Sequence, residues 1–175
     1  MPDSPDVDPD PVSSERLGAN EFERAAIAAV AEAAPDLDLD ALRTSFNLIR
    51  TATILTHRLE SQVHRPTGWS MAGFRVMFCV WVAGDLEPRD IARLSGLSRA
   101  AVSSVLNTLE RDGLIERTRE SSDRRLVTVR LTEAGANGVV DAYARQNEVE
   151  REFFSPLEPA EVRHLADELQ RLLAR

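Results

Sequence analysis

Residues 88–113, with the sequence PRDIARLSGLSRAAVSSVLNTLERDG, determine the fold that the chain predicts. If Pro88 is the first position of a helix-turn-helix, Gly96 falls where the turn requires a positive φ. The small side chain of Ala92 lets the two helices approach closely, and Val102 holds the second helix on the core. The stretch therefore predicts two short helices joined by a tight turn.

The outward face of the second helix carries small or hydrogen-bonding side chains. Ser98 is placed to cap the N-terminus of this helix. The free backbone N–H groups of the first helical turn there favour a phosphate. Arg99 suits guanine or phosphate, and Asn107 suits adenine. We expect the major groove of double-stranded DNA to be read by Ser98, Arg99, Ala100, Ser103, Ser104 and Asn107.

A β-hairpin is predicted next, because the apolar period changes to two over residues 114–117 and 126–131. Asp123 has a carboxylate that would repel phosphate, so we expect it to position an arginine by a charge-assisted hydrogen bond. The flanks and tip of the hairpin carry guanidinium groups that suit an adjacent minor groove or its phosphates, namely Arg117, Arg119, Arg124 and Arg125.

Further helices are predicted on both sides of this unit. Residues 1–14 alternate proline with aspartate and are expected to be a disordered acidic tail, whereas residues 15–37 contain one short amphipathic helix. Asp38 or Asp40 can cap a helix reaching about residue 61, and Ser70 and Thr132 can cap two more. After Pro159 the apolar residues are spaced three, four and three apart, which is typical of a helix packed along another. The expected fold is mainly α with a small β-hairpin wing.

A net charge of −8 spread evenly over the chain would argue against a nucleic-acid binder, but the charge is distributed unevenly. Residues 1–40 hold eleven acidic residues and two arginines, so the remainder carries +1. Residues 98–131 carry +2, which allows a modest basic face. The single cysteine cannot form an internal disulfide, and neither a signal peptide nor a membrane span is found. We expect a cytoplasmic protein.

Three motifs in one order, LNTLERDGLI at 106–115, SDRR at 122–125 and VRLTEAG at 129–135, resemble the MarR family of bacterial regulators. The resemblance covers about residues 41–175. It implies a MarR-like domain over 38–175, with a winged helix-turn-helix at 70–131 and dimerisation helices at 38–61 and 133–174. It further implies a homodimer on a pseudo-palindromic operator, a small ligand that releases DNA, and minor-groove reading by Arg124 or Arg125.

Effector pockets in this family lie between the first helix, the following apolar helix and the winged domain. The resemblance therefore points to an aromatic or carboxylate-bearing effector, with an arginine clamping the carboxylate and an indole covering the ring. Ion pairs and core packing are the alternative roles for the same side chains. The candidates are Arg50, His57, Trp69 and Arg75.

Other functions have weaker support. Cys79 is the candidate for a redox-responsive regulator, but its apolar neighbours favour core packing. His57, His64 and His164 lack metal-site spacing, and we expect them at the surface or at an interface. No catalytic or cofactor-binding motif is found, so we expect neither an enzyme nor a cofactor. A DNA-binding protein without an effector and a scaffold for protein contacts stay open as alternatives.

Overall fold

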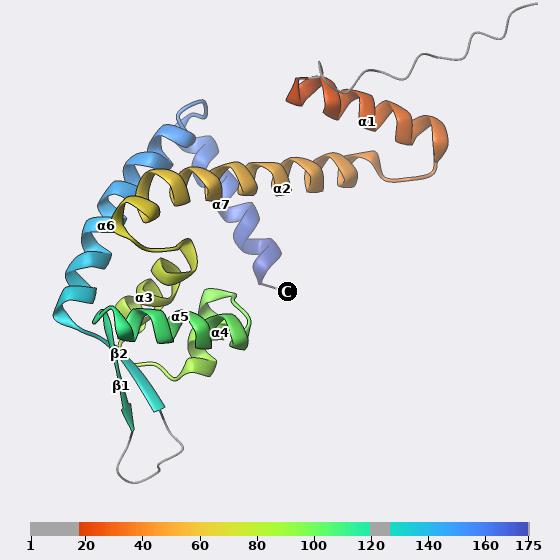
Figure 1. Ribbon diagram of the computed structural model, residues 1–175. Coiled ribbons are helices and arrows are strands. Elements are labelled where there is room, and N and C mark those ends of the chain that lie inside the picture. Colours follow the sequence, from red (N-terminus) through yellow and green to blue (C-terminus); the bar gives the residue numbers. More distant parts are fainter. Residues whose placement is uncertain (1–17, 120–126, 175) are drawn as a thin grey trace, which may run out of the picture. The chain divides into compact units, whose positions relative to one another are not determined.

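The computed structural model describes residues 18–119 and 127–174 (Figure 1). The chain divides into two compact units, one ending at Ala52 and the other beginning at Thr53. The expected tail over residues 1–14 lies outside the described residues, as do the predicted wing residues Asp123, Arg124 and Arg125. The secondary structure consists of α1 (Ala19–Ala33), α2 (Leu39–Leu59), the π-helical turn η1 (Glu60–His64), the 3-10 turn η2 (Arg65–Thr67), α3 (Met71–Ala83), α4 (Pro88–Ser95), α5 (Arg99–Arg111), β1 (Ile115–Arg119), β2 (Val127–Leu131), α6 (Glu133–Phe153) and α7 (Pro159–Leu173).

The first unit is a helical hairpin in which α1 lies beside the beginning of α2. Phe22 stacks on Phe46 with ring centroids 5.9 Å apart. The Oε1 atom of Glu23 accepts hydrogen bonds from Asn47 and Arg43, and these bonds hold the pKa of Glu23 below its usual range. The N-terminal extension therefore contains the predicted helix, which is attached to α2 by an apolar contact and a polar one.

Side-chain caps at three helix starts agree with the sequence prediction. Ser70 Oγ accepts from Gly73 N at 3.0 Å, Ser98 Oγ from Ala101 N at 3.1 Å, and Thr132 Oγ1 from Gly135 N at 3.0 Å. Each cap satisfies a backbone donor that has no partner within its helix. The predicted turn is also present, since Gly96 has a φ of 68° after α4.

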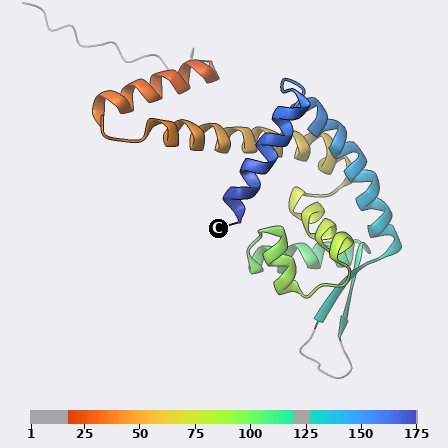
Figure 2. The same ribbon diagram turned by 180° about the vertical axis from the view of Figure 1, so that it is seen from behind.

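The core of the second unit is built around α3, which packs against α4, α5, α6 and β2. Val76 and Met77 of α3 are fully buried, and so are Ile91 of α4 and Val102 of α5. Figure 2 shows α6 running beside the winged part and continuing through a short turn into α7. The mainly helical fold with a two-stranded antiparallel hairpin confirms the predicted fold class.

The hairpin is attached to the helices by backbone and side-chain bonds. Leu86 exchanges two backbone hydrogen bonds with Val129 of β2, at 2.8 and 3.1 Å. Arg130 forms a bidentate ion pair with Asp85, with a shortest distance of 2.6 Å between Nη2 and Oδ2. These bonds tie β2 to the loop between α3 and α4.

His64 corrects the expectation that the histidines lie at the surface or an interface, because its side chain is fully buried. The imidazole stacks on Phe74 with centroids 4.7 Å apart, and neither ring nitrogen has a hydrogen-bond partner among the described residues. Burial lowers the pKa of His64, although Glu60 and Gln146 act in the opposite direction. The residue lies at the end of η1, and no sequence pattern predicted that π-helical turn.

The buried imidazole makes the stability of the protein sensitive to acid. Because the pKa of His64 is lower in the folded state, the unfolded chain binds the proton first, and stability falls as the pH drops below about 6.5. We expect the free energy of unfolding in urea to fall less between pH 7.5 and pH 5.5 in a His64→Phe variant than in the wild type. The His57→Gln variant, which removes an exposed histidine instead of the buried one, serves as the control. Identical pH dependence of His64→Phe and wild type would contradict this account.

Candidate nucleic-acid interface

Helix α5 has one buried face and one exposed face. Val102, Leu106 and Leu109 are at most 3% exposed and belong to the core. The structure leaves the predicted major-groove residues exposed along the other side of the helix and its cap, namely Ser98, Arg99, Ala100, Ser103, Ser104 and Asn107. The helix therefore presents a polar surface on a rigid apolar base.

The N-terminal end of this surface suits an anion. Ser98 caps the helix, and Arg99 follows at the first helical position. Arg99 is exposed and forms no ion pair with any residue in the ranges 18–119 and 127–174. An unneutralised guanidinium beside a helix N-terminus favours a phosphate or the acceptor edge of a base.

A groove of about 510 Å³ lies between α4, α5 and the wing strands. Three guanidinium-bearing side chains and an apolar floor line it together. The lining residues are Pro88, Arg89, Arg99, Ser103, Leu106, Arg117 and Val127. The groove therefore joins the first helix of the helix-turn-helix, the second helix and the wing on one continuous surface.

Arg117 lies against α5 rather than pointing freely away from the wing. Its Nη2 atom donates to Asn107 Oδ1 at 2.7 Å, and its Nε atom is 3.4 Å from Glu110 Oε2. The Arg117 side chain is 27% exposed. Sequence reasoning named Arg117 and Asn107 but missed their mutual contact and the part played by Glu110. Arg119 ends β1, and its role as a wing contact, like those of Arg124, Arg125 and Asp123, stays a prediction.

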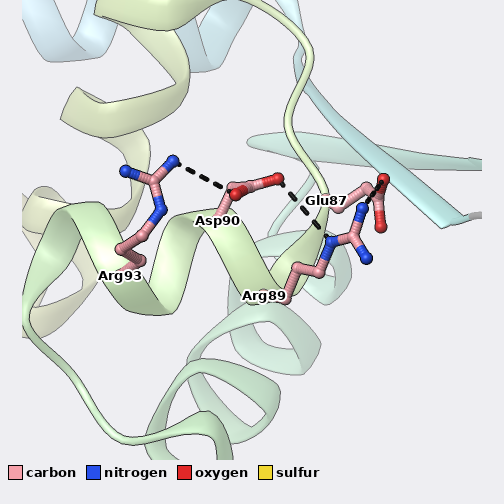
Figure 3. A network of polar contacts seen from close by, with 4 residues as sticks. All are labelled: Glu87, Arg89, Asp90 and Arg93. Atoms are coloured by element: carbon pink, nitrogen blue, oxygen red, sulfur yellow. Dashed lines mark hydrogen bonds and ion pairs between the residues drawn. The ribbon is translucent and has the colours of Figure 1, made fainter.

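Helix α4 carries a network of ion pairs that sequence reasoning also missed (Figure 3). Arg89 contacts Glu87 at 3.0 Å and Asp90 at 3.9 Å. Arg93 contacts Asp90 at 3.1 Å, and the i, i+3 spacing of this pair is visible in the sequence. The carboxylates of Glu87 and Asp90 thus neutralise two guanidinium groups, and one of these, that of Arg89, lines the groove.

The effector candidates have structural contacts of their own. Arg75 donates from Nη2 to the carbonyl of Ser95, at the end of α4. Trp69 lies so close to Gly138 of α6 that an added Cβ would sit 2.6 Å from the indole. Trp69 also lines a cavity of about 230 Å³ with residues of α3 and α5, and of the four candidates only Trp69 lines it.

The other two candidates, His57 and Arg50, lie on α2. His57 is exposed, in the part of α2 that belongs to the second unit. Arg50 belongs to the first unit, where its guanidinium lies 5.2 Å from the centroid of the Phe46 ring.

Other candidate chemistries find little support. Cys79 is half-buried, and burial raises the pKa of its thiol although Arg75 opposes the shift, which disfavours the reactive thiolate. Among the described residues, no cluster of three or more His, Cys, Asp or Glu side chains is placed to hold a metal ion. Within the same ranges, no helix combines the length and apolar character needed to cross a membrane.

Comparisons with known proteins find related sequences and similar folds. The MarR family model matches residues 69–127. YwaE of Bacillus subtilis, described as an uncharacterised HTH-type transcriptional regulator, is 32% identical over 136 residues, covering 78% of this chain and 80% of the relative.

Two solved structures share the fold. One is a mutant of MarR from E. coli complexed with operator DNA, with a TM-score of 0.68, 22% identity, and coverage of 82% of this chain and 97% of that chain. The other is BpsR of Bordetella bronchiseptica, whose DNA binding is described as regulated by 6-hydroxynicotinic acid. It has a TM-score of 0.69 and 21% identity, and covers 74% of this chain and 98% of that chain.

The ion pairs on α4 generate a prediction for nucleic-acid affinity. Asp90→Asn removes one negative charge and releases Arg93 and Arg89, so we expect affinity for duplex DNA to rise. The gain should be roughly 1.4- to five-fold for each copy of the helix, since exposed ion pairs contribute roughly 0.2–1 kcal/mol. Fluorescence anisotropy with a labelled duplex measures the change. Asp112→Asn is the matched control, because it makes the same charge change beside Arg111 at the far end of α5. Equal or weaker binding of Asp90→Asn relative to this control would show that α4 does not face the phosphates.

Proposed function

The chain belongs to the MarR family of transcriptional regulators, which bind DNA, and from this premise we propose that it is a homodimeric repressor of a pseudo-palindromic operator. The observation that supports the proposal most strongly is the exposed polar face of α5, capped by Ser98 and held on a buried apolar base. Such a helix fits a major groove about 12 Å wide.

Each part of the surface has a proposed role. Ser98, Arg99, Ala100, Ser103, Ser104 and Asn107 contact bases and phosphates in the major groove. Arg119, Arg124 and Arg125 of the wing contact the neighbouring minor groove, with Asp123 positioning one of them. The groove lined by Arg89 and Arg99 contacts the phosphate backbone beside α5.

Dimerisation is proposed through residues 38–61 and 133–174. Helix α7 buries no residue within a single chain, although it carries the predicted apolar seam. Leu165 and Leu172 of α7 are 38% and 53% exposed, and Leu157 before the helix is 38% exposed. Large apolar side chains grouped in this way favour contact with another protein surface, and a second copy of the chain supplies the two-fold symmetry that a palindromic operator needs.

A small effector is proposed to release the operator, and Arg75 offers a physical route. Its guanidinium binds the carbonyl of Ser95, directly before the turn that leads into α5. An aromatic carboxylate that binds the guanidinium of Arg75 competes with the Ser95 carbonyl for this hydrogen bond. Its binding therefore favours a different position of α5. His57 and Trp69, which belong to the same unit as Arg75, stay candidates for further contacts, whereas a role of Arg50 stays a prediction from the sequence. The regulation of BpsR by an aromatic carboxylic acid supports this class of ligand.

The salt dependence of binding tests the DNA-binding surface. If the dimer neutralises about six phosphates, the slope of log affinity against log salt should be near −5. Arg124→Ala combined with Arg125→Ala removes up to four guanidinium groups per dimer, so we expect weaker binding and a slope flatter by about two or more. The comparison uses anisotropy titrations between 50 and 200 mM salt. Full tolerance of the double change would instead favour a winged helix that serves protein contacts.

Reciprocal coupling tests the effector. We expect 6-hydroxynicotinate or benzoate to bind the free protein at least ten-fold more tightly than the operator complex, because a ligand shifts only an equilibrium whose two states it binds differently. Isothermal titration of the protein with and without operator measures both affinities. The Arg75→Gln variant should lose most of this difference. Equal affinities, or no binding of either acid, would favour a regulator that does not respond to aromatic acids.

A further inference from the structure

The contact between the wing and the recognition helix carries a further consequence. Arg117 lies on β1 opposite Val129 of β2, on the same strand face as the fully buried Ile115. Its guanidinium therefore points toward α5. The strand pairing and the bonds from Leu86 to Val129 hold the backbone of this arginine in place.

Two residues of α5, one turn apart, receive the guanidinium. Arg117 Nη2 donates to Asn107 Oδ1 at 2.7 Å, which is the length of a strong charge-assisted hydrogen bond. Arg117 Nε lies 3.4 Å from Glu110 Oε2 without forming a hydrogen bond, so Glu110 contributes an electrostatic attraction that draws the guanidinium toward α5. The Arg117 side chain is 27% exposed, and because it lines the groove it stays a candidate for a phosphate contact as well.

This contact fixes the direction of the Asn107 amide. An amide group has an acceptor end and a donor end, and the acceptor end of Asn107 faces Arg117. The Asn107 side chain is exposed, and its Nδ2 atom donates to no residue in the described ranges. Asn107 therefore offers its two N–H donors to whatever lies in front of α5.

We propose that Arg117 is a positioning residue that turns the two N–H donors of Asn107 toward the DNA and so favours guanine over adenine at one position of each half-site. This inference rests on the proposed function, because it requires α5 to lie in the major groove. Guanine presents two acceptors there, O6 and N7. Adenine presents one acceptor and one donor, so bidentate reading of adenine needs Oδ1 to accept a second hydrogen bond while it accepts from Arg117.

Binding-site selection with a randomised operator tests the proposal. The Asn107→Ala variant identifies the position that Asn107 reads, since its base preference is lost there. At that position the wild type should prefer guanine over adenine by about ten-fold, which lies within the usual discrimination of a specific side-chain contact. Arg117→Ala frees Oδ1 and should move the preference toward adenine, whereas Arg117→Lys, which retains a cationic donor, should keep guanine.

Arg130→Ala is the matched control, because it removes another arginine that ties the wing to the helical part without touching α5. It should leave the base preference unchanged even where it weakens the fold. A preference that is unchanged in Arg117→Ala, or that changes equally in Arg130→Ala, overturns the proposal.

A measurement on the wild type alone keeps the proposal falsifiable if Arg117→Ala fails to fold. Replacing guanine by 7-deazaguanine at the identified position removes the N7 acceptor and should lower affinity by about five-fold or more. Unchanged affinity overturns the inference. Failure of the wild type to select any sequence would instead contradict the proposed function itself.

Discussion

The burial of Val102, Leu106 and Leu109 in the core shared with α3 fixes which side of α5 faces solvent. Burying an aliphatic side chain of this size contributes about 1.5–3 kcal/mol, so rotating α5 by half a turn would cost several kilocalories per mole. The polar face and the capped N-terminus have only one orientation as a result. Every proposed base contact depends on this packing.

The wing depends on the same core through a different set of bonds. Val129 pairs with Leu86, Arg130 pairs with Asp85, and Arg117 reaches across to α5. The hairpin is thus attached both to the loop between α3 and α4 and to α5. The contribution of each exposed pair is small, but together these contacts define the position of the two wing strands. In this arrangement Arg117 of the wing also determines which hydrogen-bonding groups of Asn107 on α5 remain available.

Local signals in the sequence predicted most of the fold. The caps at Ser70, Ser98 and Thr132 and the turn at Gly96 depend on a few neighbouring residues, and the structure has them all. The prediction that His64 lies at the surface or at an interface is wrong because this residue ends the π-helical turn after α2, where it is buried. No local sequence pattern marks that turn. The helices were therefore predictable, whereas the irregular connection between two of them was not.

The candidate site was predictable to a lesser degree, for a related reason. The exposed face of α5 follows from its helical period, so its members could be named in advance. The role of Arg117 follows from the strand period, which places it on the same face as Ile115, but its partners Asn107 and Glu110 come from another element. Likewise, nothing near Arg75 in the sequence indicates that its guanidinium binds the carbonyl of Ser95, twenty residues away. Contacts between distant segments need the folded structure.

The most direct test of the central claim, that two copies of α5 occupy successive major grooves of one duplex, is hydroxyl-radical footprinting of a selected operator. The account predicts two sets of protected backbone positions on one side of the duplex, with centres one helical turn, about 10 base pairs, apart. A single protected tract, or two tracts on opposite sides of the duplex, would contradict it.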